Sequence, residues 1–163
     1  MADYCLSPLA HDDIHSISAI EQRAHCSPWA DTQLAAPTGR FDHAYGLRLM
    51  QPHALLIGYF YARCIAGEGE LFNIAIDPTY QGQGWGSVLL EAMIKHLGEA
   101  GAECIWLEVR ESNAAAQALY QKHGFKLVNR RKHYYACTNG RREDAWVMQK
   151  NGVKTKAAHH YPA

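Results

Sequence analysis

The sequence lacks an excess of charge of either sign. Its 163 residues contain 16 lysines and arginines against 16 aspartates and glutamates, so the formal net charge is +0 with histidine neutral. Proteins that coat nucleic acids or anionic membranes rely on a basic excess. The balance therefore argues against direct nucleic-acid binding and against membrane-surface binding, and leaves room only for a local basic patch.

The sequence also lacks long apolar runs. The longest, Ala54–Ala62, has the length of a strand, whereas a membrane-spanning helix needs about 18 apolar residues or more. The opening residues Met1-Ala2-Asp3-Tyr4 show no basic segment followed by an apolar one, so no signal peptide is expected. We expect a cytoplasmic protein without a membrane segment.

Cysteine is sparse and unpatterned. The chain has an odd number of cysteines, widely spaced and without a CxxC pair: Cys5, Cys26, Cys64, Cys104 and Cys137. This usage argues against a disulfide framework and against a zinc site, and it is typical of a reducing compartment. The histidines show no metal-ligand spacing either, so no metal is expected.

What is present is the composition of an ordinary globular domain, with 48% hydrophobic and 20% charged residues. The length suits one domain with a core of its own. We assign this domain to residues 1–150. Residues 151–163 show no apolar periodicity and are expected to form a flexible tail.

The first half of the chain predicts a strand, two helices and three further strands. Apolar spacing and turn residues place the first strand at Tyr4–Leu6 and the first helix from Asp12 or Asp13 to Ala24. The second helix is expected from a Ser27-Pro28-Trp29 cap to Ala35, with a break at Pro37-Thr38-Gly39. The later strands are expected at Ala44–Met50, Leu55–Cys64 and Glu70–Ile76. Because short connections join the three later strands, they are expected to form an antiparallel meander.

The second half alternates helices and strands. The expected elements are a helix Gly86–Ala100, a strand Cys104–Val109, a helix Ala114–His123 and final strands Phe125–Tyr135 and Ala145–Gln149. The strand ending at Ile76, the helix Gly86–Ala100 and the strand Cys104–Val109 form a βαβ unit, so its two strands should be parallel. The predicted fold class is α/β, a mixed central sheet with helices on both faces.

A glycine-rich loop, Gln81-Gly82-Gln83-Gly84-Trp85-Gly86, lies between a predicted strand and a predicted helix. The first N–H groups of a helix lack internal partners and carry partial positive charge, and glycines let the backbone approach a phosphate closely. The glycine spacing does not match a Rossmann loop, and no Gly-Lys-Ser/Thr follows as in a Walker A loop. A tight turn that merely needs glycine is the alternative.

With this loop the chain resembles the GNAT superfamily of N-acetyltransferases, whose Gln/Arg-x-x-Gly-x-Gly/Ala motif is here Gln81, Gly84 and Gly86. More narrowly it resembles the RimI-type ribosomal-protein-alanine N-acetyltransferases. The matching segments include Ile20–His25 with Pro28-Trp29, Leu71–Pro78, Trp106–Arg110, Ser112–Ala116, Ala118-Leu119-Tyr120, Gly124-Phe125, Arg130-Arg131, Tyr134-Tyr135, and Gly140 with Glu143-Asp144-Ala145. Two departures, Ala136 and the pair Arg141-Arg142, lie in the last hairpin, which in this family borders the acceptor site.

The resemblance implies a GNAT fold and acetyl-CoA as cosubstrate. It implies that backbone amides of Ile74, Ala75 and Ile76 bind the acetyl carbonyl and pantetheine arm. The pyrophosphate would bind amides of Gly82, Gln83, Gly84, Trp85, Gly86 and Ser87. Asn113 would contact the cosubstrate, or act only as a helix cap.

Two side chains are candidates for acid–base chemistry. Glu108 is the only charged side chain within Cys104–Val109, and Tyr120 lies on the following helix. The alternatives are a strand-end charge that reaches solvent and a core tyrosine with its hydroxyl at the rim. By the resemblance, Glu108 is the general base and Tyr120 the general acid. The clustered Arg130-Arg131-Lys132 and Arg141-Arg142 are interpreted as a hairpin surface, or as contacts to a phosphate or ribosomal RNA.

The leading hypothesis is therefore an enzyme that acetylates the N-terminal alanine of a small-subunit ribosomal protein in a ternary complex. A lysine or small-amine N-acetyltransferase on the same fold is the near alternative. A non-catalytic coenzyme A-binding module is the alternative of a different class, and the presence of both Glu108 and Tyr120 disfavours it.

Overall fold

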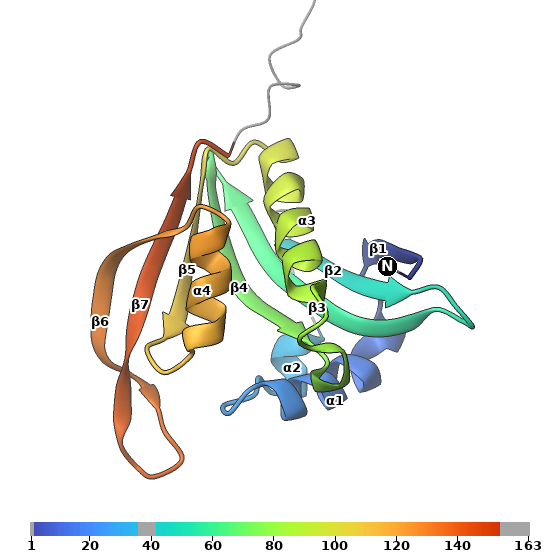
Figure 1. Cartoon of the computed structure of the whole chain (residues 1–163), viewed down its shortest axis with the longest axis horizontal. Coiled ribbons are helices and arrows are strands. Elements are labelled where there is room, and N and C mark those ends of the chain that lie inside the picture. The colour runs from blue at the N-terminus through green and yellow to red at the C-terminus, as the bar shows by residue number, and fades with distance from the viewer. Residues whose placement is uncertain (1, 36–41, 154–163) are drawn as a thin grey trace, which may run out of the picture.

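A computed structural model describes residues 2–35 and 42–153 (Figure 1). One sheet runs through them, with the strand order β1-β2-β3-β4-β5-β7-β6. The strands are β1 (Tyr4–Pro8), β2 (Asp42–Leu49), β3 (Leu55–Ile65), β4 (Glu68–Ile76), β5 (Cys104–Arg110), β6 (Lys126–Ala136) and β7 (Arg142–Asn151). Each predicted strand is present.

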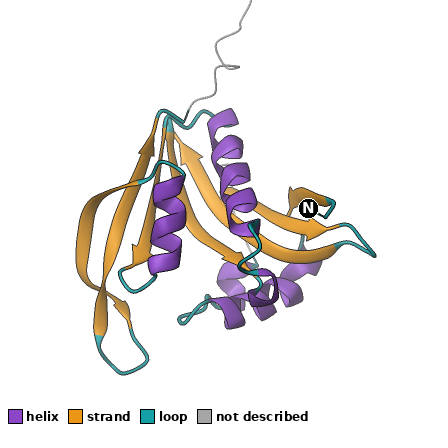
Figure 2. Cartoon of the chain, in the orientation of Figure 1, coloured by secondary structure: helices purple, strands orange, loops and turns teal. Residues whose placement is uncertain are grey.

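Helices cover both faces of this sheet (Figure 2). They are the 3-10 helix η1 (His11–Asp13), α1 (Ile14–Ala24), α2 (Asp31–Leu34), the 3-10 helix η2 (Pro78–Tyr80), α3 (Trp85–Glu99) and α4 (Ala114–Lys122). In the part of the chain that the structure describes, no helix is long and apolar enough to span a bilayer.

The topology confirms the predicted class. Strands β1 to β4 form an antiparallel meander. After α3 the chain enters β5 parallel to β4, as expected for a βαβ unit. The last hairpin then places β7 antiparallel between β5 and β6. The result is a mixed sheet whose only parallel pair within the described ranges is β4 with β5.

The predicted cap at Ser27-Pro28-Trp29 is wrong. Helix α2 is short and begins at Asp31, and the backbone N–H of Ala30 donates to Oε1 of Gln33 at 2.9 Å. The preceding residues are engaged elsewhere, because the backbone N–H of Trp29 donates to Glu21 at 2.8 Å. The chain before α2 is therefore a connection between elements, and its polar groups satisfy partners outside the helix.

The last strand is longer than expected. β7 continues to Asn151, and Val153 is 7% exposed and belongs to the core. Packing extends past residue 150, since the backbone N–H of Val153 donates to the Glu103 carbonyl at 3.1 Å. Of the tail predicted over residues 151–163, residues 154–163 lie outside the described residues, as does the predicted break at Pro37–Gly39.

The pairing between the two parallel strands ends about halfway along their length. β4 and β5 pair from Glu68 with Cys104 as far as Leu71 with Leu107. Beyond this point β4 stays paired with β3 to Ile76, and β5 stays paired with β7 to Arg110. The carboxyl ends of β4 and β5 consequently diverge, as Figure 1 shows. Each keeps one unpaired backbone edge that faces the other strand.

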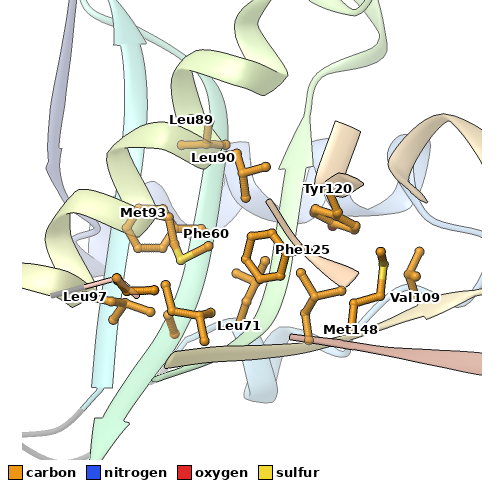
Figure 3. Close-up of a cluster of buried hydrophobic side chains, with 14 of the residues drawn as sticks. Phe60, Leu71, Leu89, Leu90, Met93, Leu97, Val109, Tyr120, Phe125 and Met148 are labelled. Atoms are coloured by element: carbon orange, nitrogen blue, oxygen red, sulfur yellow. The ribbon is translucent and has the colours of Figure 1, made fainter. Parts of the chain in front are cut away.

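The core is divided between the two faces of the sheet. On one face α3 packs Leu89, Leu90, Met93 and Leu97 against the strands, and Tyr120 and Phe125 continue the same cluster beside α4 (Figure 3). On the other face α1 and α2 contribute Ile17, Ile20 and Leu34. Alternation along β3 supplies both clusters, since Tyr59 and Tyr61 belong to the second and Phe60 to the first.

A buried carboxylate ties helix α1 to β3 and β4. Glu21 is 1% exposed and accepts hydrogen bonds from the Tyr59 hydroxyl at 2.5 Å and from Nδ2 of Asn73 at 3.0 Å. It also accepts the bond from the Trp29 amide, while His25 Nε2 lies 3.0 Å from Oδ1 of Asn73. The network anchors the start of the α1–α2 connection to the end of β4. Burial and the neighbouring Glu21 carboxylate raise the pKa of Tyr59, so that its hydroxyl remains a donor.

Replacement of Glu21 tests this anchor. Glu21→Ala leaves the buried Tyr59 and Asn73 donors and the partly buried Trp29 amide without their acceptor, and we expect the free energy of unfolding to fall by about 3 kcal/mol. Tyr59→Phe, which removes one donor and keeps the ring, should cost about 1 kcal/mol. Urea denaturation of both variants measures the two losses. A Glu21→Ala protein as stable as the wild type would contradict the anchoring role.

Candidate active site

The glycine-rich loop joins the end of β4 to the start of α3. Gly82 and Gly84 have φ angles of 75° and 90°, a region that residues with a Cβ rarely adopt. The backbone N–H of Val88 donates to the Gly84 carbonyl at 3.3 Å. The amides that precede it in the first turn have no partner inside the helix. The loop therefore presents N–H groups at the positive end of a helix of 15 residues, an arrangement suited to phosphate.

Side chains of the loop serve mainly to hold its shape. Nε2 of Gln81 donates to the Ile76 carbonyl at 3.0 Å. Trp85 is 4% exposed and packs edge-to-face on Tyr4, with 5.5 Å between ring centroids. A Cβ on Gly86 would lie 3.3 Å from Cδ2 of Leu119 on α4. The backbone is thus the part of this loop best placed to meet a ligand, as the predicted role requires.

The end of β4 provides a second stretch of backbone. Ile74 lies opposite Phe60 and Ile76 opposite Gly58 on β3, while pairing with β5 has already ended. Since backbone groups of alternate residues point to opposite strand edges, this stretch directs part of its hydrogen-bonding capacity toward the gap between β4 and β5. The predicted residues Ile74, Ala75 and Ile76 therefore flank the divergence of the strands.

Glu108 lies on β5 just beyond the last β4 pairing. Alternation places it on the face opposite Leu107 and Val109, which are buried in the α3 and α4 cluster. Oε1 of Glu108 forms an ion pair with Nε of Arg131 at 2.9 Å. The Tyr134 hydroxyl is also hydrogen-bonded to Glu108, and the negative charge of Glu108 raises the pKa of Tyr134.

A cavity of about 860 Å³ opens on this face of the sheet, and Glu108 forms part of its wall. The other lining residues come from β3, the β3–β4 turn and β4 to β7: Arg63, Ile65, Ala66, Glu68, Gly69, Glu70, Trp106, Leu107, Asn129, Arg131 and Val147. The candidate base is therefore accessible to a molecule that enters this cavity.

Tyr120 occupies the other side of the sheet. It is 6% exposed, and its ring packs edge-to-face on Phe125 with 5.8 Å between centroids (Figure 3). Burial raises the pKa of its hydroxyl, with a smaller contribution from Tyr135. Tyr120 is thus a core tyrosine that stays protonated at neutral pH, which is the state a general acid needs.

Asn113 caps helix α4. Its Oδ1 accepts from the backbone N–H of Ala116 at 3.1 Å. Nearby, Nε2 of the buried Gln117 donates to the carbonyls of Arg110 and Glu111 at 2.9 and 2.8 Å. These bonds fix the turn that leads from β5 into α4. The capping bond uses the oxygen of Asn113, and its predicted contact with the cosubstrate stays a prediction.

Arg110 joins two segments that are far apart in the sequence. Nη2 donates to the Ser27 hydroxyl at 2.9 Å, and Nη1 donates to the Ala136 carbonyl at 3.0 Å. The guanidinium also lies 4.6 Å from the ring centroid of Tyr135. The α1–α2 connection is thereby attached to the β6–β7 hairpin beside the carboxyl end of β5.

Sequence reasoning missed Arg110, Arg131 and Glu21 as parts of this region. Glu21 offered a signal, because it follows Ile17 by four residues and lies on the apolar stripe of α1. The partner of Arg131 had no such signal, since it depends on the pairing of β6 with β7. The arginine cluster is dispersed: Arg130 lies over the Trp146 ring at 5.4 Å, and Arg142 donates to the His133 and Tyr134 carbonyls at 2.7 and 2.8 Å.

Metal ligands do not gather in this region. No group of three or more His, Cys, Asp or Glu side chains within residues 2–35 and 42–153 is arranged to hold a metal ion. What the region holds is unpaired backbone where β4 and β5 diverge, a carboxylate in a cavity on one face of the sheet and a protonated phenol in the core on the other face.

Comparison with known proteins gives relatives along most of the chain. The model of the Acetyltransferase (GNAT) family matches residues 14–125. The chain is 41% identical over 143 residues to [ribosomal protein bS18]-alanine N-acetyltransferase of Escherichia coli (strain K12), covering 88% of this chain and 94% of that protein. It is 42% identical over 143 residues to the protein of that name from Haemophilus influenzae, covering 88% and 95%.

Solved structures agree with the sequence comparisons. The crystal structure of the ribosomal-protein-S18-alanine N-acetyltransferase from Escherichia coli superposes with a TM-score of 0.84 and 37% identity, covering 98% of this chain and 100% of the other. The match spans the diverging strands, the glycine-rich loop and the last hairpin. By sequence and by fold, the chain belongs to the Acetyltransferase (GNAT) family.

Proposed function

We propose that the protein transfers the acetyl group of acetyl-CoA to the α-amine of the N-terminal alanine of a small-subunit ribosomal protein, of the bS18 kind on which its relatives act. The observation that carries the proposal is the divergence of β4 and β5, with the first turn of α3 beyond the end of β4 and Glu108 on β5. One arrangement thus offers an anion site, an open strand edge and a base.

The residues present fit acetyl-CoA. Its pyrophosphate needs several N–H donors around one anion, which the loop from Gly82 to Ser87 offers where Gly82 and Gly84 turn the backbone. Its pantetheine arm carries amide groups that need strand-like partners, which the unpaired edge of Ile74–Ile76 offers. Acetyl-CoA supplies an acyl group activated by its bond to sulfur.

Glu108 serves as the base. The α-amine of a protein has a pKa of about 7.7–8.0, so it is largely protonated at neutral pH and must lose a proton to attack. A carboxylate at the wall of the cavity accepts that proton, directly or through a water, while the amine nitrogen bonds to the acetyl carbon. The nitrogen loses its second proton to water as the amide forms, so of the two protons that leave the ammonium one passes to Glu108 and one to solvent.

Tyr120 serves as the acid. As the bond from the acetyl carbon to sulfur breaks, the departing thiolate takes the proton of the Tyr120 hydroxyl. Burial raises the pKa of this hydroxyl, and the same low-dielectric surroundings penalise an unprotonated thiolate. The proton therefore passes between two groups whose negatively charged forms are both destabilised by burial. No covalent enzyme intermediate is needed, which leaves Cys104 and Cys137 without a catalytic role.

The acid–base pair is tested by Glu108→Gln and Tyr120→Phe. Loss of a positioned general base or acid should lower kcat by about 100-fold or more in each variant, while the dissociation constant for acetyl-CoA stays within about twofold of wild type. Steady-state kinetics and calorimetric titration measure the two quantities. Glu111→Gln, an exposed carboxylate three residues from Glu108, is the control. Full turnover in both variants would show that Glu108 does not accept the proton of the amine and that Tyr120 does not donate one to the thiolate.

The loop is tested by Gly82→Ala. An alanine at φ 75° meets nothing within 4 Å, so the change costs backbone strain of about 1–2 kcal/mol without a clash. If the loop relaxes to relieve that strain, acetyl-CoA must restore it, and the dissociation constant should rise about tenfold. Gly101→Ala, at φ 102° with equally open space and at the far end of α3, should lose similar stability and keep its affinity. Equal affinities in both variants would contradict a phosphate-binding loop.

The acceptor is tested by mass spectrometry. The purified protein is incubated with acetyl-CoA and two synthetic peptides of equal length, one with a free N-terminal alanine and no lysine, the other N-terminally blocked with one lysine. We expect the alanine peptide to be acetylated at least ten times faster than the lysine peptide. A lysine ε-amine has a pKa of about 10.4, so the base must remove a proton that is held much more tightly. Preferential acetylation of the lysine peptide would identify a lysine acetyltransferase instead.

A further inference from the structure

Two cysteines flank the contacts of Arg110. Cys26 directly precedes Ser27, whose hydroxyl accepts a hydrogen bond from Nη2 of Arg110 at 2.9 Å. Cys137 directly follows Ala136, whose carbonyl accepts from Nη1 of the same guanidinium at 3.0 Å. One side chain therefore holds the α1–α2 connection and the β6–β7 hairpin together at the residues next to the two thiols.

The position of Cys26 is fixed from both sides. Before it, His25 Nε2 lies 3.0 Å from Oδ1 of Asn73, and after it the backbone N–H of Trp29 donates to Glu21 at 2.8 Å. Cys26 itself is exposed. Exposure makes a thiol accessible to oxidants in solution. Cys26 is thus an accessible thiol on a segment that is anchored near it on either side.

Cys137 is a thiol of a different kind. It is partly buried, its backbone N–H donates to the Arg141 carbonyl at 2.8 Å, and its Sγ donates to Oε2 of Glu143 at 3.4 Å. Partial burial and the Glu143 carboxylate raise the pKa of the Cys137 thiol, and the nearby Cys26 thiol adds a smaller contribution in the same direction. Cys137 therefore stays protonated at neutral pH, while its neighbour Cys26 faces solvent.

A second pair of neighbouring cysteines shows what distinguishes the first. Cys104 contributes to the raised pKa of the buried Cys64. Strand β4 nevertheless runs between them, since Cys64 on β3 pairs with Gly69 and Cys104 on β5 pairs with Glu68. Two strand spacings amount to about 9–10 Å, which exceeds the Cα separation of about 7 Å that a disulfide can bridge. Cys26 and Cys137 instead lie outside the sheet, on two connections that Arg110 already joins.

We propose that Cys26 and Cys137 form a reversible oxidation site, at which a peroxide converts the two thiols into a disulfide that links the α1–α2 connection to the β6–β7 hairpin. The bond makes covalent the attachment that Arg110 provides through hydrogen bonds. Disulfides of this kind in a reducing compartment are transient and redox-sensing rather than structural. The site does not depend on acetyl transfer.

The chemistry balances with one peroxide for each pair of thiols. The Cys26 sulfur attacks a peroxide oxygen, the O–O bond breaks, and Cys26 becomes a sulfenic acid while the other oxygen leaves as water with the thiol proton. The Cys137 sulfur then attacks the Cys26 sulfur, the S–O bond breaks, and the hydroxide leaves as water with the Cys137 proton. The sulfurs give up the electrons that reduce the peroxide. A small thiol restores both cysteines by thiol–disulfide exchange.

The site is tested by mapping disulfides after oxidation. The reduced full-length protein is treated with equimolar hydrogen peroxide, the remaining thiols are alkylated, and its proteolytic peptides are weighed by mass spectrometry. We expect the peptides of Cys26 and Cys137 to be joined with loss of both thiol hydrogens, at a rate independent of protein concentration. Dithiothreitol should separate them. No link is expected between Cys64 and Cys104.

Single substitutions separate the roles of the two thiols. In Cys137→Ser, Cys26 should stop at the sulfenic acid, which dimedone captures. In Cys26→Ser, Cys137 should remain a thiol that can be alkylated, because it is partly buried and protonated. Cys104→Ser is the matched control, since it removes a partly buried cysteine on β5, and its protein should form the link at the wild-type rate.

Hydrogen exchange measures the attachment itself. In the oxidised protein the amides of residues 26–30 and 137–141 should exchange about tenfold more slowly, because neither segment can then open without the other. The amides of α3 should keep their rates. Exchange at both segments that does not change on oxidation would overturn the covalent attachment.

The mapping has outcomes that overturn the site directly. These are a wild-type protein that does not join Cys26 to Cys137, oxidation that ends in dimers linked through Cys26, or a link that is lost equally in Cys104→Ser. Each would leave the proposed function standing, because acetyl transfer is not part of the measurement.

Discussion

Everything in the site depends on where two parallel strands stop pairing. β5 is held by β7 along its whole length, and β4 is held by β3 to its end, yet their mutual ladder ends at Leu71 and Leu107. A bulge opposite Tyr61 and Ala62 shifts the β3–β4 register next to that point, around Phe72, and bulges increase local twist and bend a strand. The two halves of the sheet are therefore anchored on their outer sides and free to separate between them. Unpaired backbone that would be costly in a closed sheet is here the edge that the proposed function assigns to acetyl-CoA.

The same divergence bears on the proposed acid–base pair, because its two members lie on opposite faces of the sheet. Glu108 points into the cavity on one face, while Tyr120 lies in the core on the other. In a continuous sheet the backbone ladder would separate them, but next to Glu108 the ladder between β4 and β5 has already ended. Burial then acts differently on each group, since the carboxylate stays in reach of an amine from solvent and the phenol keeps its proton.

Much of the fold follows from the sequence, because it depends on local signals. The apolar stripe of α3, the glycines at 82 and 84 and the turn residues between strands predict the βαβ unit and the loop, and the structure confirms both. Glu108 is identifiable as a candidate because it is the single charge in the predicted apolar strand Cys104–Val109. The surroundings of the site are harder to predict, since Arg110 and Arg131 find their partners through contacts between distant elements. Ser27 shows the limit of local signals. The sequence predicts that it caps a helix, whereas its hydroxyl accepts a hydrogen bond from Arg110, 83 residues away.

These long-range contacts also bear on how a neutral chain would recognise the basic acceptor that we propose. A formal net charge of +0 gives no long-range attraction for a ribosomal protein, so selectivity has to come from charges placed at the site. Arg110 attaches the α1–α2 connection to the last hairpin, and the Glu21 network fixes that connection to β4. The connection is consequently fixed at both of its ends beside the carboxyl end of β5, and at one end by an arginine that is only 15% exposed. Charged contacts have their full effect only when neither partner moves, because a mobile ion pair in water is worth little.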